Sequence, residues 1–205
     1  MARQCDGFRV VNKTKMKRKY NIILGSNSPR RKELLAGLDL DFKVHVIPGI
    51  EESYPKDLPV LETSGYIACE KAEPYKATLG KDDLVITADT VVVLGDKVLG
   101  KPKGASEARE MLRMLSGRTH HVVTGVCLTS AEKQRCFSVV TDVTFKALSD
   151  AEIDYYVDKY QPLDKAGAYG IQEWIGYVGV TSIKGSYFNV MGLPVQRIYD
   201  ELQNF

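Results

Sequence analysis

The chain has 205 residues, 44% of them hydrophobic and 26% charged, which is typical of a globular protein long enough to bury a core. It contains no run approaching the roughly 20 apolar residues that a membrane span needs. The net charge of +2 conceals seven basic residues and one acid within residues 1–20, so the remaining chain carries about −4 and lacks the basic character of a nucleic-acid-binding domain.

Strands and helices alternate in the first half of the chain. In chain order, we expect a buried strand at residues 20–25, a helix from Ser28 to about residue 39, a strand at 42–47, a helix at 61–79 and a strand at 84–94. Serine is a good N-cap and proline is favoured at the first helical position, so Ser28-Pro29 marks a helix start. Pro74 should end or kink the second helix early.

The second half is richer in strands. The patterns predict a short hairpin strand at 97–99, a helix at 105–115, strands at 120–129 and 135–145, a helix at 151–160, a loop at 164–172, a strand at 178–183 and a helix at 195–202. This order predicts a three-layer α/β protein with a mixed sheet. We interpret residues 20–205 as one domain and residues 1–19 as a basic extension, expected to be disordered.

The four cysteines show no C-x-x-C pairing, and the N-terminus has no apolar signal region. Three of them (Cys69, Cys127 and Cys136) lie in apolar-patterned elements. We therefore expect buried, reduced thiols in a cytoplasmic protein.

The segment from Gly25 to Arg31 lies where the first strand passes into the first helix, a place where open α/β folds bind ligands. Free backbone N–H groups and the helix dipole favour an anion there. A capping box would place Glu or Gln at position 31, but the sequence has Arg30 and Arg31, which suit bidentate phosphate contacts. The alternative is an ordinary helix start with solvated arginines.

Several charged residues suit phosphate chemistry with a metal. Asp89 lies inside an apolar strand, where a carboxylate is costly unless it pairs or binds a metal, or lies at an exposed strand end. Glu51, Glu52 and Glu70 add carboxylates, which are ligands for Mg²⁺ or Mn²⁺, and Lys71 and Lys101 add cations. Each of these residues taken singly also fits a solvated surface or turn. Together they indicate metal-assisted attack of water on phosphorus.

Other catalytic constellations are excluded by the sequence. It contains no P-loop, no G-x-G-x-x-G and no G-x-S-x-G motif. His120 and His121 are adjacent on a predicted strand and point to opposite faces, so they cannot share a metal.

The motifs form an ordered set from about residue 20 to the C-terminus. They are Ser26-Asn27-Ser28-Pro29-Arg30-Arg31, Glu51-Glu52, Glu70-Lys71-Ala72, Ala88-Asp89-Thr90, Leu99-Gly100-Lys101-Pro102, DKAGAYGIQ at 164–172 and Gly192-Leu193-Pro194. With this set the chain resembles the Maf proteins, nucleotide pyrophosphatases related in fold to the inosine triphosphate pyrophosphatases. One departure is Glu173-Trp174, which follows Gln172 where the family usually has glycine.

The resemblance implies two lobes around a central cleft, with Asp89 as the catalytic residue that activates water. It implies a phosphate site of Ser26, Arg30, Arg31, Lys71 and Lys101, a Mg²⁺ or Mn²⁺ site of Glu51, Glu52, Glu70 and Asp89, and substrate selection by Arg30, Thr90 and Gln172. In a regular strand Thr90 would point away from Asp89, so the strand must twist or end there, or Thr90 must act indirectly.

The function expected from this resemblance is hydrolysis of dTTP and UTP to the nucleoside monophosphate and pyrophosphate, removing non-standard or excess nucleotides. The alternatives are a 7-methylguanosine triphosphate pyrophosphatase and a non-catalytic nucleotide-binding regulator of cell division. We expect a small-molecule nucleotide as partner, with no nucleic acid and no membrane. A homodimer is compatible with the sequence, which leaves the oligomeric state open.

Overall fold

The computed structural model describes residues 20–50 and 52–205, so the expected extension at 1–19 and the proposed metal ligand Glu51 lie outside the described residues. One mixed sheet of seven strands dominates the fold, in the order β2-β1-β3-β5-β6-β7, with β4 also pairing with β3. The strands are β1 (Asn21–Leu24), β2 (Phe42–Val44), β3 (Asp83–Leu94), β4 (Lys97–Leu99), β5 (Thr119–Ser130), β6 (Gln134–Phe145) and β7 (Val180–Lys184). Strands β1, β2 and β3 are parallel, whereas the other pairings are antiparallel. The predicted mixed sheet is confirmed.

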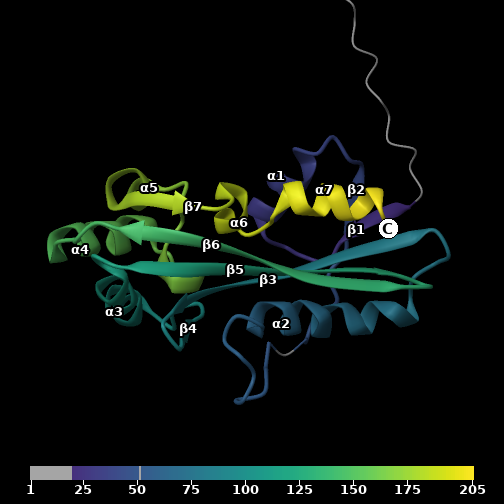
Figure 1. Ribbon diagram of the computed structural model, residues 1–205, viewed down its shortest axis with the longest axis horizontal. Helices are drawn as coiled ribbons and strands as arrows, with labels where there is room; N and C mark the ends of the chain where they lie inside the picture. The colour runs from purple at the N-terminus through teal and green to yellow at the C-terminus, as the bar shows by residue number, and fades with distance from the viewer. Residues whose placement is uncertain (1–19, 51) are drawn as a thin grey trace, which may run out of the picture.

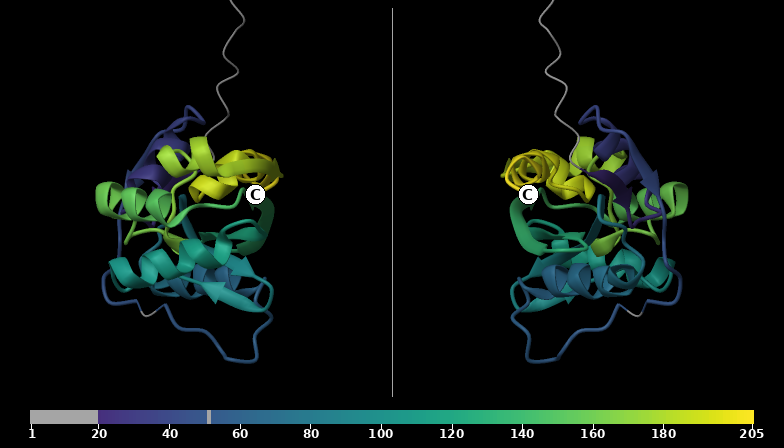
Figure 2. Two further views of the ribbon diagram at one scale, coloured as in Figure 1. Left: turned by 90° about the vertical axis from the view of Figure 1, so that its left-hand side faces the viewer. Right: turned by 90° about the vertical axis from the view of Figure 1, so that its right-hand side faces the viewer.

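Helices cover both faces of this sheet. They are α1 (Pro29–Ala36), α2 (Thr63–Ala72), α3 (Ala105–Leu115), α4 (Asp150–Tyr160), α5 (Trp174–Gly179), α6 (Tyr187–Met191) and α7 (Val195–Gln203), with 3-10 turns at Glu73–Ala77 and Ala166–Ala168. Figure 1 shows α1 and α7 on one face and α2 on the other. The end-on views show the same three layers (Figure 2). No helix in the described ranges is long and apolar enough to cross a membrane.

The core is divided into two main clusters along the long strands. One cluster joins Leu24, Leu34, Ile86 and other apolar residues beneath α1 and α7. The other joins Val92 and Phe145 to the apolar faces of α3, α4 and α5. Strand β3 contributes to both clusters, and Asp89 and Thr90 lie between its two contributions. The middle of β3 is therefore the junction between two packed halves.

The edge of β3 is open at this junction. On the side away from β5, β3 pairs with β1 up to Ile86 and with β4 from Val92 onward. Within the described chain no strand pairs with β3 on that side between these two residues. Side chains from both faces of β3 can therefore reach a space beside this edge, because no neighbouring strand separates them.

Close backbone packing places α2 on the opposite face of the sheet. A Cβ atom at Gly125 of β5 would lie 2.3 Å from backbone atoms of Ser64 and Gly65 in α2. Only glycine permits this approach, which brings the helix that carries Lys71 against β3 and β5. Pro74 ends the α-helical part of the predicted 61–79 segment, as expected, and the chain continues as a 3-10 turn.

Three expectations are corrected. The second strand ends at Val44 rather than at residue 47, and the last strand is Val180–Lys184, preceded by the short helix α5. Only glycine fits at position 176 of this helix, because a Cβ there would lie 1.8 Å from the Ile171 carbonyl oxygen. Of the three thiols expected to be buried, only Cys127 is buried; Cys69 is partly exposed, and Cys136 lies in the exposed first part of β6.

Candidate active site

A cavity of about 510 Å³ lies beside the open edge of β3. Its walls come from the β1–α1 loop, the segment after β2, α2, β3, the loop after β4, residues 164–172 and the end of α6. The predicted site residues among them are Ser26, Arg30, Arg31, Glu52, Lys71, Asp89, Thr90, Lys101 and Gln172. The structure thus gathers into one cavity residues that are up to 146 positions apart in the sequence, from Ser26 to Gln172.

Lys71 joins two carboxylates at the cavity wall. Its Nζ lies 2.8 Å from Asp89 Oδ1 and 2.8 Å from Glu52 Oε1. The side chains of Lys71 and Asp89 are only 15% and 10% exposed, so this pair is shielded from bulk water. Within the described chain, Asp89 Oδ2 makes no hydrogen bond to the protein. One carboxylate oxygen of Asp89 is therefore available to a ligand or a water molecule.

Glu52 connects this pair to Lys101, whose Nζ lies 3.5 Å from Glu52 Oε2. Partial burial works to raise the pKa of Glu52, but the hydrogen bond and charge of Lys71, with help from Lys101, hold it below its usual value. Glu52 is therefore ionised at neutral pH. Glu70 is exposed on α2 and is not among the residues that line the cavity, so the structure does not bring it to Asp89.

At the start of α1, two serine side chains accept hydrogen bonds from backbone N–H groups. Ser28 Oγ accepts a hydrogen bond from the Arg31 backbone N–H at 3.4 Å, and Ser26 Oγ accepts one from the Ser28 N–H at 3.2 Å. Ser28 and Pro29 thus cap the helix as predicted. Two backbone donors at this helix start are thus satisfied by serine oxygens, and the anion site expected there stays a prediction.

Arg31 is partly buried and contacts β3 and the end of α6. Its guanidinium donates to the carbonyls of Ala88 at 2.8 Å and Gly192 at 2.9 Å, and to Thr90 Oγ1 at 3.1 Å. Burial lowers the pKa of Arg31, although the negative charge of Asp89 opposes the shift. The open edge of β3 makes the Ala88 carbonyl accessible to Arg31. Most of the side-chain donors of Arg31 are therefore hydrogen-bonded within the protein.

Thr90 and Asp89 lie on opposite faces of β3, as the strand periodicity requires. Asp89 meets Lys71 from α2, whereas Thr90 meets Arg31 from α1. Both residues nevertheless line the same cavity. The open edge of β3 explains this, because the cavity extends past the edge and reaches both faces of the strand.

A chain of ion pairs runs from Arg30 into the loop at 164–172. Arg30 NH1 lies 2.9 Å from Asp164 Oδ2, and Lys165 Nζ lies 2.7 Å from Asp164 Oδ1 and 3.1 Å from Glu173 Oε1. Burial opposes ionisation of Asp164, but hydrogen bonds from Lys165 and Arg30 lower its pKa from 3.8 to about 2. The network ties the predicted specificity residue Arg30 to the loop that carries Gln172.

Glu173 holds the far end of that loop. Its carboxylate accepts a hydrogen bond from the hydroxyl of Tyr156 on α4, and this hydroxyl accepts a hydrogen bond from the Gly170 N–H at 3.0 Å. Burial, with the charge and hydrogen bond of Glu173, raises the pKa of Tyr156, so the hydroxyl stays protonated. The departure from glycine at Glu173 thus gives the loop a fixed anchor.

Gln172 has an unsatisfied polar atom. Its side-chain Oε1 is buried, and no donor in the described chain reaches it. A buried acceptor without a partner costs about 1–3 kcal/mol. Because Gln172 also lines the cavity, a ligand donor is the partner that would remove this cost.

Sequence reasoning missed Lys165, Asp164, Glu173 and Tyr156 as parts of the site. Lys165 is nearly buried, with a side chain 9% exposed. The available signal was a lysine and an aspartate in a loop otherwise made of small and apolar residues. Glu173 was marked only as a departure from the family's usual glycine, and Tyr156 gave no signal, since the two residues meet through the packing of α4 against this loop.

Comparisons with known proteins show which family model, relatives and solved structure this chain is similar to. The sequence model of the family described as "Maf-like protein" matches residues 21–205. A protein of Phocaeicola vulgatus named "dTTP/UTP pyrophosphatase" is 62% identical, with 90% of this chain and 96% of that protein covered. One of Flavobacterium psychrophilum with the same name is 49% identical, with 89% and 93% covered. Among solved structures, a HAM1 protein from Coxiella burnetii aligns with a TM-score of 0.44 and 16% identity over 91% of this chain and 100% of that chain.

Proposed function

The chain belongs to the family of Maf-like proteins, and from this premise we propose that it is a pyrophosphatase that hydrolyses dTTP and UTP to the nucleoside monophosphate and inorganic pyrophosphate. Relatives that share 49% to 62% of its residues over about nine tenths of the chain carry the name dTTP/UTP pyrophosphatase. The alternatives, a 7-methylguanosine triphosphate pyrophosphatase and a non-catalytic regulator, have no comparable support.

One observation carries the proposal at the level of the site. The cavity holds a cluster of cations and an acid with a free oxygen, together with an unsatisfied glutamine amide. The cations are Arg30, Arg31, Lys71, Lys101 and Lys165. A triphosphate needs positive charge along its length, and a base needs a hydrogen-bonding partner. The cavity therefore offers cations to the triphosphate and a hydrogen-bonding amide to the base of the same nucleotide.

We assign the proton-accepting role to Asp89. A water oxygen forms a new bond to the α phosphorus as the bond from that phosphorus to the bridging oxygen breaks, and pyrophosphate leaves. The proton of the attacking water passes to Asp89, whose Oδ2 is free while Lys71 holds Oδ1. Lys71 thus fixes the orientation of the carboxylate, and its charge also favours the negative charge that builds up on the phosphate.

The donor set around Lys71 also fits a divalent cation. Asp89 and Glu52 each place a carboxylate oxygen 2.8 Å from the same nitrogen, so they already face a common positive charge. Asp89 and Glu52 would hold Mg²⁺ or Mn²⁺, which would polarise the phosphate. Glu51 stays a predicted ligand.

Gln172 is the proposed reader of the base. Its Oε1 can accept the N3–H of uracil or thymine while its Nε2 donates to O4. Cytosine presents the reverse pattern, so it would leave polar atoms unpaired as long as neighbouring groups keep the Gln172 amide from flipping. The anchor of Tyr156 and Glu173 keeps the loop in place for this contact. Arg30 and Thr90 complete the proposed specificity residues.

In the cell, we propose removal of excess or non-standard pyrimidine nucleotides in the cytoplasm. The proposed partner is the small-molecule nucleotide. The homodimer stays a prediction.

The experiment is to separate the products of UTP hydrolysis by anion-exchange chromatography in the presence of Mg²⁺ or Mn²⁺. We expect UMP and pyrophosphate in equal amounts, with free phosphate only after a separate inorganic pyrophosphatase is added. UDP and free phosphate as the main products would overturn the proposal in favour of a γ-phosphatase.

A further inference from the structure

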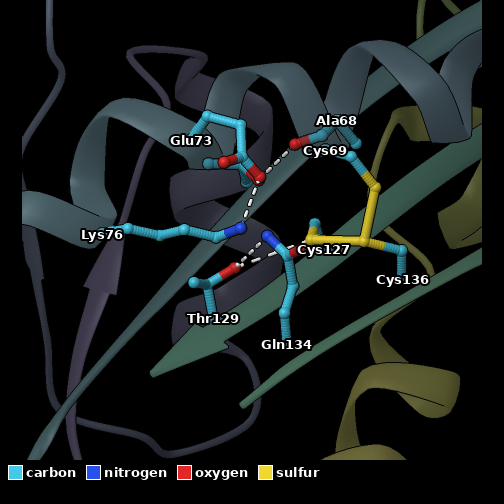
Figure 3. Close-up of a disulfide and its surroundings, with 9 residues drawn as sticks. Ala68, Cys69, Glu73, Lys76, Cys127, Thr129, Gln134 and Cys136 are labelled. Atoms are coloured by element: carbon cyan, nitrogen blue, oxygen red, sulfur yellow. Dashed lines mark hydrogen bonds and ion pairs between the residues drawn. A yellow bond between two sulfur atoms is a disulfide. The ribbon is translucent and has the colours of Figure 1, made fainter. Parts of the chain in front are cut away.

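Three cysteine side chains converge on the face of the sheet covered by α2. Cys69 comes from α2, Cys127 from β5 and Cys136 from β6, and Cys127 and Cys136 are direct partners in the register of their strands. Their sulfur atoms all lie within 4.8 Å of one another. Figure 3 shows the Cys136 sulfur in contact with both other sulfurs. We call these three residues the thiol cluster.

The two contacts of Cys136 cannot both be disulfides. A cysteine sulfur forms one bond to carbon and one to a second sulfur, so a bond to Cys69 excludes a bond to Cys127. Either disulfide would leave the third thiol unused beside it. A single shared partner would engage all three sulfurs at once.

A single cation is such a shared partner. The Cα atoms of Cys127 and Cys136 are 4.2 Å apart and those of Cys69 and Cys136 are 6.7 Å apart, near the two limits of about 4.4 to 6.8 Å that disulfides usually span. Zinc binds thiolates at about 2.3 Å, so a tetrahedral site places its sulfurs about 3.8 Å apart, within the span of the cluster. The sulfurs would separate from their present contact to make room.

We propose that the thiol cluster binds one soft cation of the zinc class through the thiolates of Cys69, Cys127 and Cys136. Water would take the fourth position, because Cys136 is exposed and leaves that side open. Thiolates are the soft ligands that ions of this class prefer. The site is separate from the proposed activity, since none of the three residues lines the cavity.

Neighbouring polar groups suit a thiolate at Cys127. Thr129 Oγ1 lies 3.6 Å from Cys127 Sγ, and the same oxygen accepts a hydrogen bond from Gln134 Nε2 at 3.0 Å. Because that oxygen is occupied as an acceptor, its own proton is available to the sulfur (Figure 3). A donor in this position stabilises a negatively charged ligand and orients it.

The bound ion would fasten α2 to the sheet. Cys69 lies two residues before Lys71, which holds Asp89. The expected effect is on stability, because a ligand that binds only the folded state raises the melting temperature.

The test titrates the full-length, chemically reduced protein with Cd²⁺, a zinc-like probe whose thiolate complexes absorb in the ultraviolet. Excess Mg²⁺ is present to occupy carboxylate sites. We expect one equivalent to bind with a thiolate-to-metal charge-transfer band, and Zn²⁺ to displace it and raise the melting temperature. Removing a direct ligand should weaken binding at least about 100-fold, so Cys136→Ser should lose the band.

Two control variants locate the site. Asp89→Asn, at the proposed active site, and Cys5→Ser, outside the described residues, should both keep the band and the stoichiometry. A band that survives in Cys136→Ser, or that disappears in Cys5→Ser, would overturn the assignment to these three residues. So would a reduced wild-type protein that has four titratable thiols but binds no Cd²⁺. Persistence of a disulfide under reducing conditions would likewise favour a covalent link over an ion.

Discussion

Replacement of Gln172 by leucine tests two effects of its side-chain oxygen separately: the effect on the stability of the free protein and the effect on binding of the base. Leucine has a similar size but cannot form hydrogen bonds. In the free protein, Gln172 Oε1 is buried without a partner in the described chain. Its removal should therefore leave the free energy of unfolding unchanged or raise it by about 1 kcal/mol.

The same substitution should lower activity on the proposed substrates. Two hydrogen bonds to the uracil edge, at about 0.5–1.5 kcal/mol each, contribute about 1–3 kcal/mol to transition-state binding. Since 1.4 kcal/mol corresponds to about a factor of ten, kcat/KM for UTP should fall about 5- to 150-fold. The preference for UTP over CTP should fall with it.

The assay measures kcat/KM for UTP and CTP beside a thermal melt. Gln196→Leu is the matched control, because Gln196 is exposed on α7 and, among the described residues, its side chain bonds to Asp200 alone. It should change neither activity nor selectivity. If Gln172→Leu keeps the wild-type preference for UTP over CTP, the reasoning that links the unsatisfied oxygen to the base is refuted.

Three further predictions concern catalysis, the loop anchor and pH. Asp89→Asn should lower kcat about 10²- to 10⁴-fold with little change in the melting temperature, and a folded variant with near wild-type kcat would contradict the assigned role. Tyr156→Phe leaves the buried Gly170 N–H without its acceptor and should cost about 1–3 kcal/mol in chemical denaturation, whereas Tyr155→Phe on the exposed side of α4 should cost less than about 0.5 kcal/mol; equal costs would argue against the anchor. Burial, with a smaller effect from the adjacent histidine, lowers the pKa of His120 from 6.5 to about 4, so the unfolded state binds more protons between these values. The free energy of unfolding should therefore fall by about 3 kcal/mol from pH 7 to pH 4, and a His120→Gln variant that shows the same decline would rule this out.

Much of the sheet could be predicted because its strands are strongly patterned. The β-branched run of β3 and the alternation in β6 mark strands from local sequence alone, and Ser28-Pro29 marks the start of α1. The short helices α5 and α6 could not be predicted in this way. The sequence of α5 contains two glycines and two β-branched residues, and its conformation depends on the close contact of Gly176 with Ile171.

In the candidate site, too, some features could be predicted from local sequence, whereas others depend on how the elements pack. Asp89 could be singled out because a carboxylate within an apolar strand needs a partner, and the structure supplies Lys71. The position of Thr90 could not be resolved, because the open edge of β3 depends on where β1 ends and β4 begins. The exposure of Cys136 likewise follows from how far the neighbouring elements cover β6, which strand periodicity does not reveal.

The most direct test of the proposed function is kcat/KM over a panel of dTTP, UTP, CTP, GTP and 7-methylguanosine triphosphate under one set of metal and pH conditions. We predict that dTTP and UTP exceed each of the other three by at least about tenfold, since cytosine presents the reversed donor–acceptor pair to Gln172 and the two guanine nucleotides carry a larger base. Preference for the methylated purine, or equal turnover of CTP and UTP, would contradict the assignment of this protein as a dTTP/UTP pyrophosphatase.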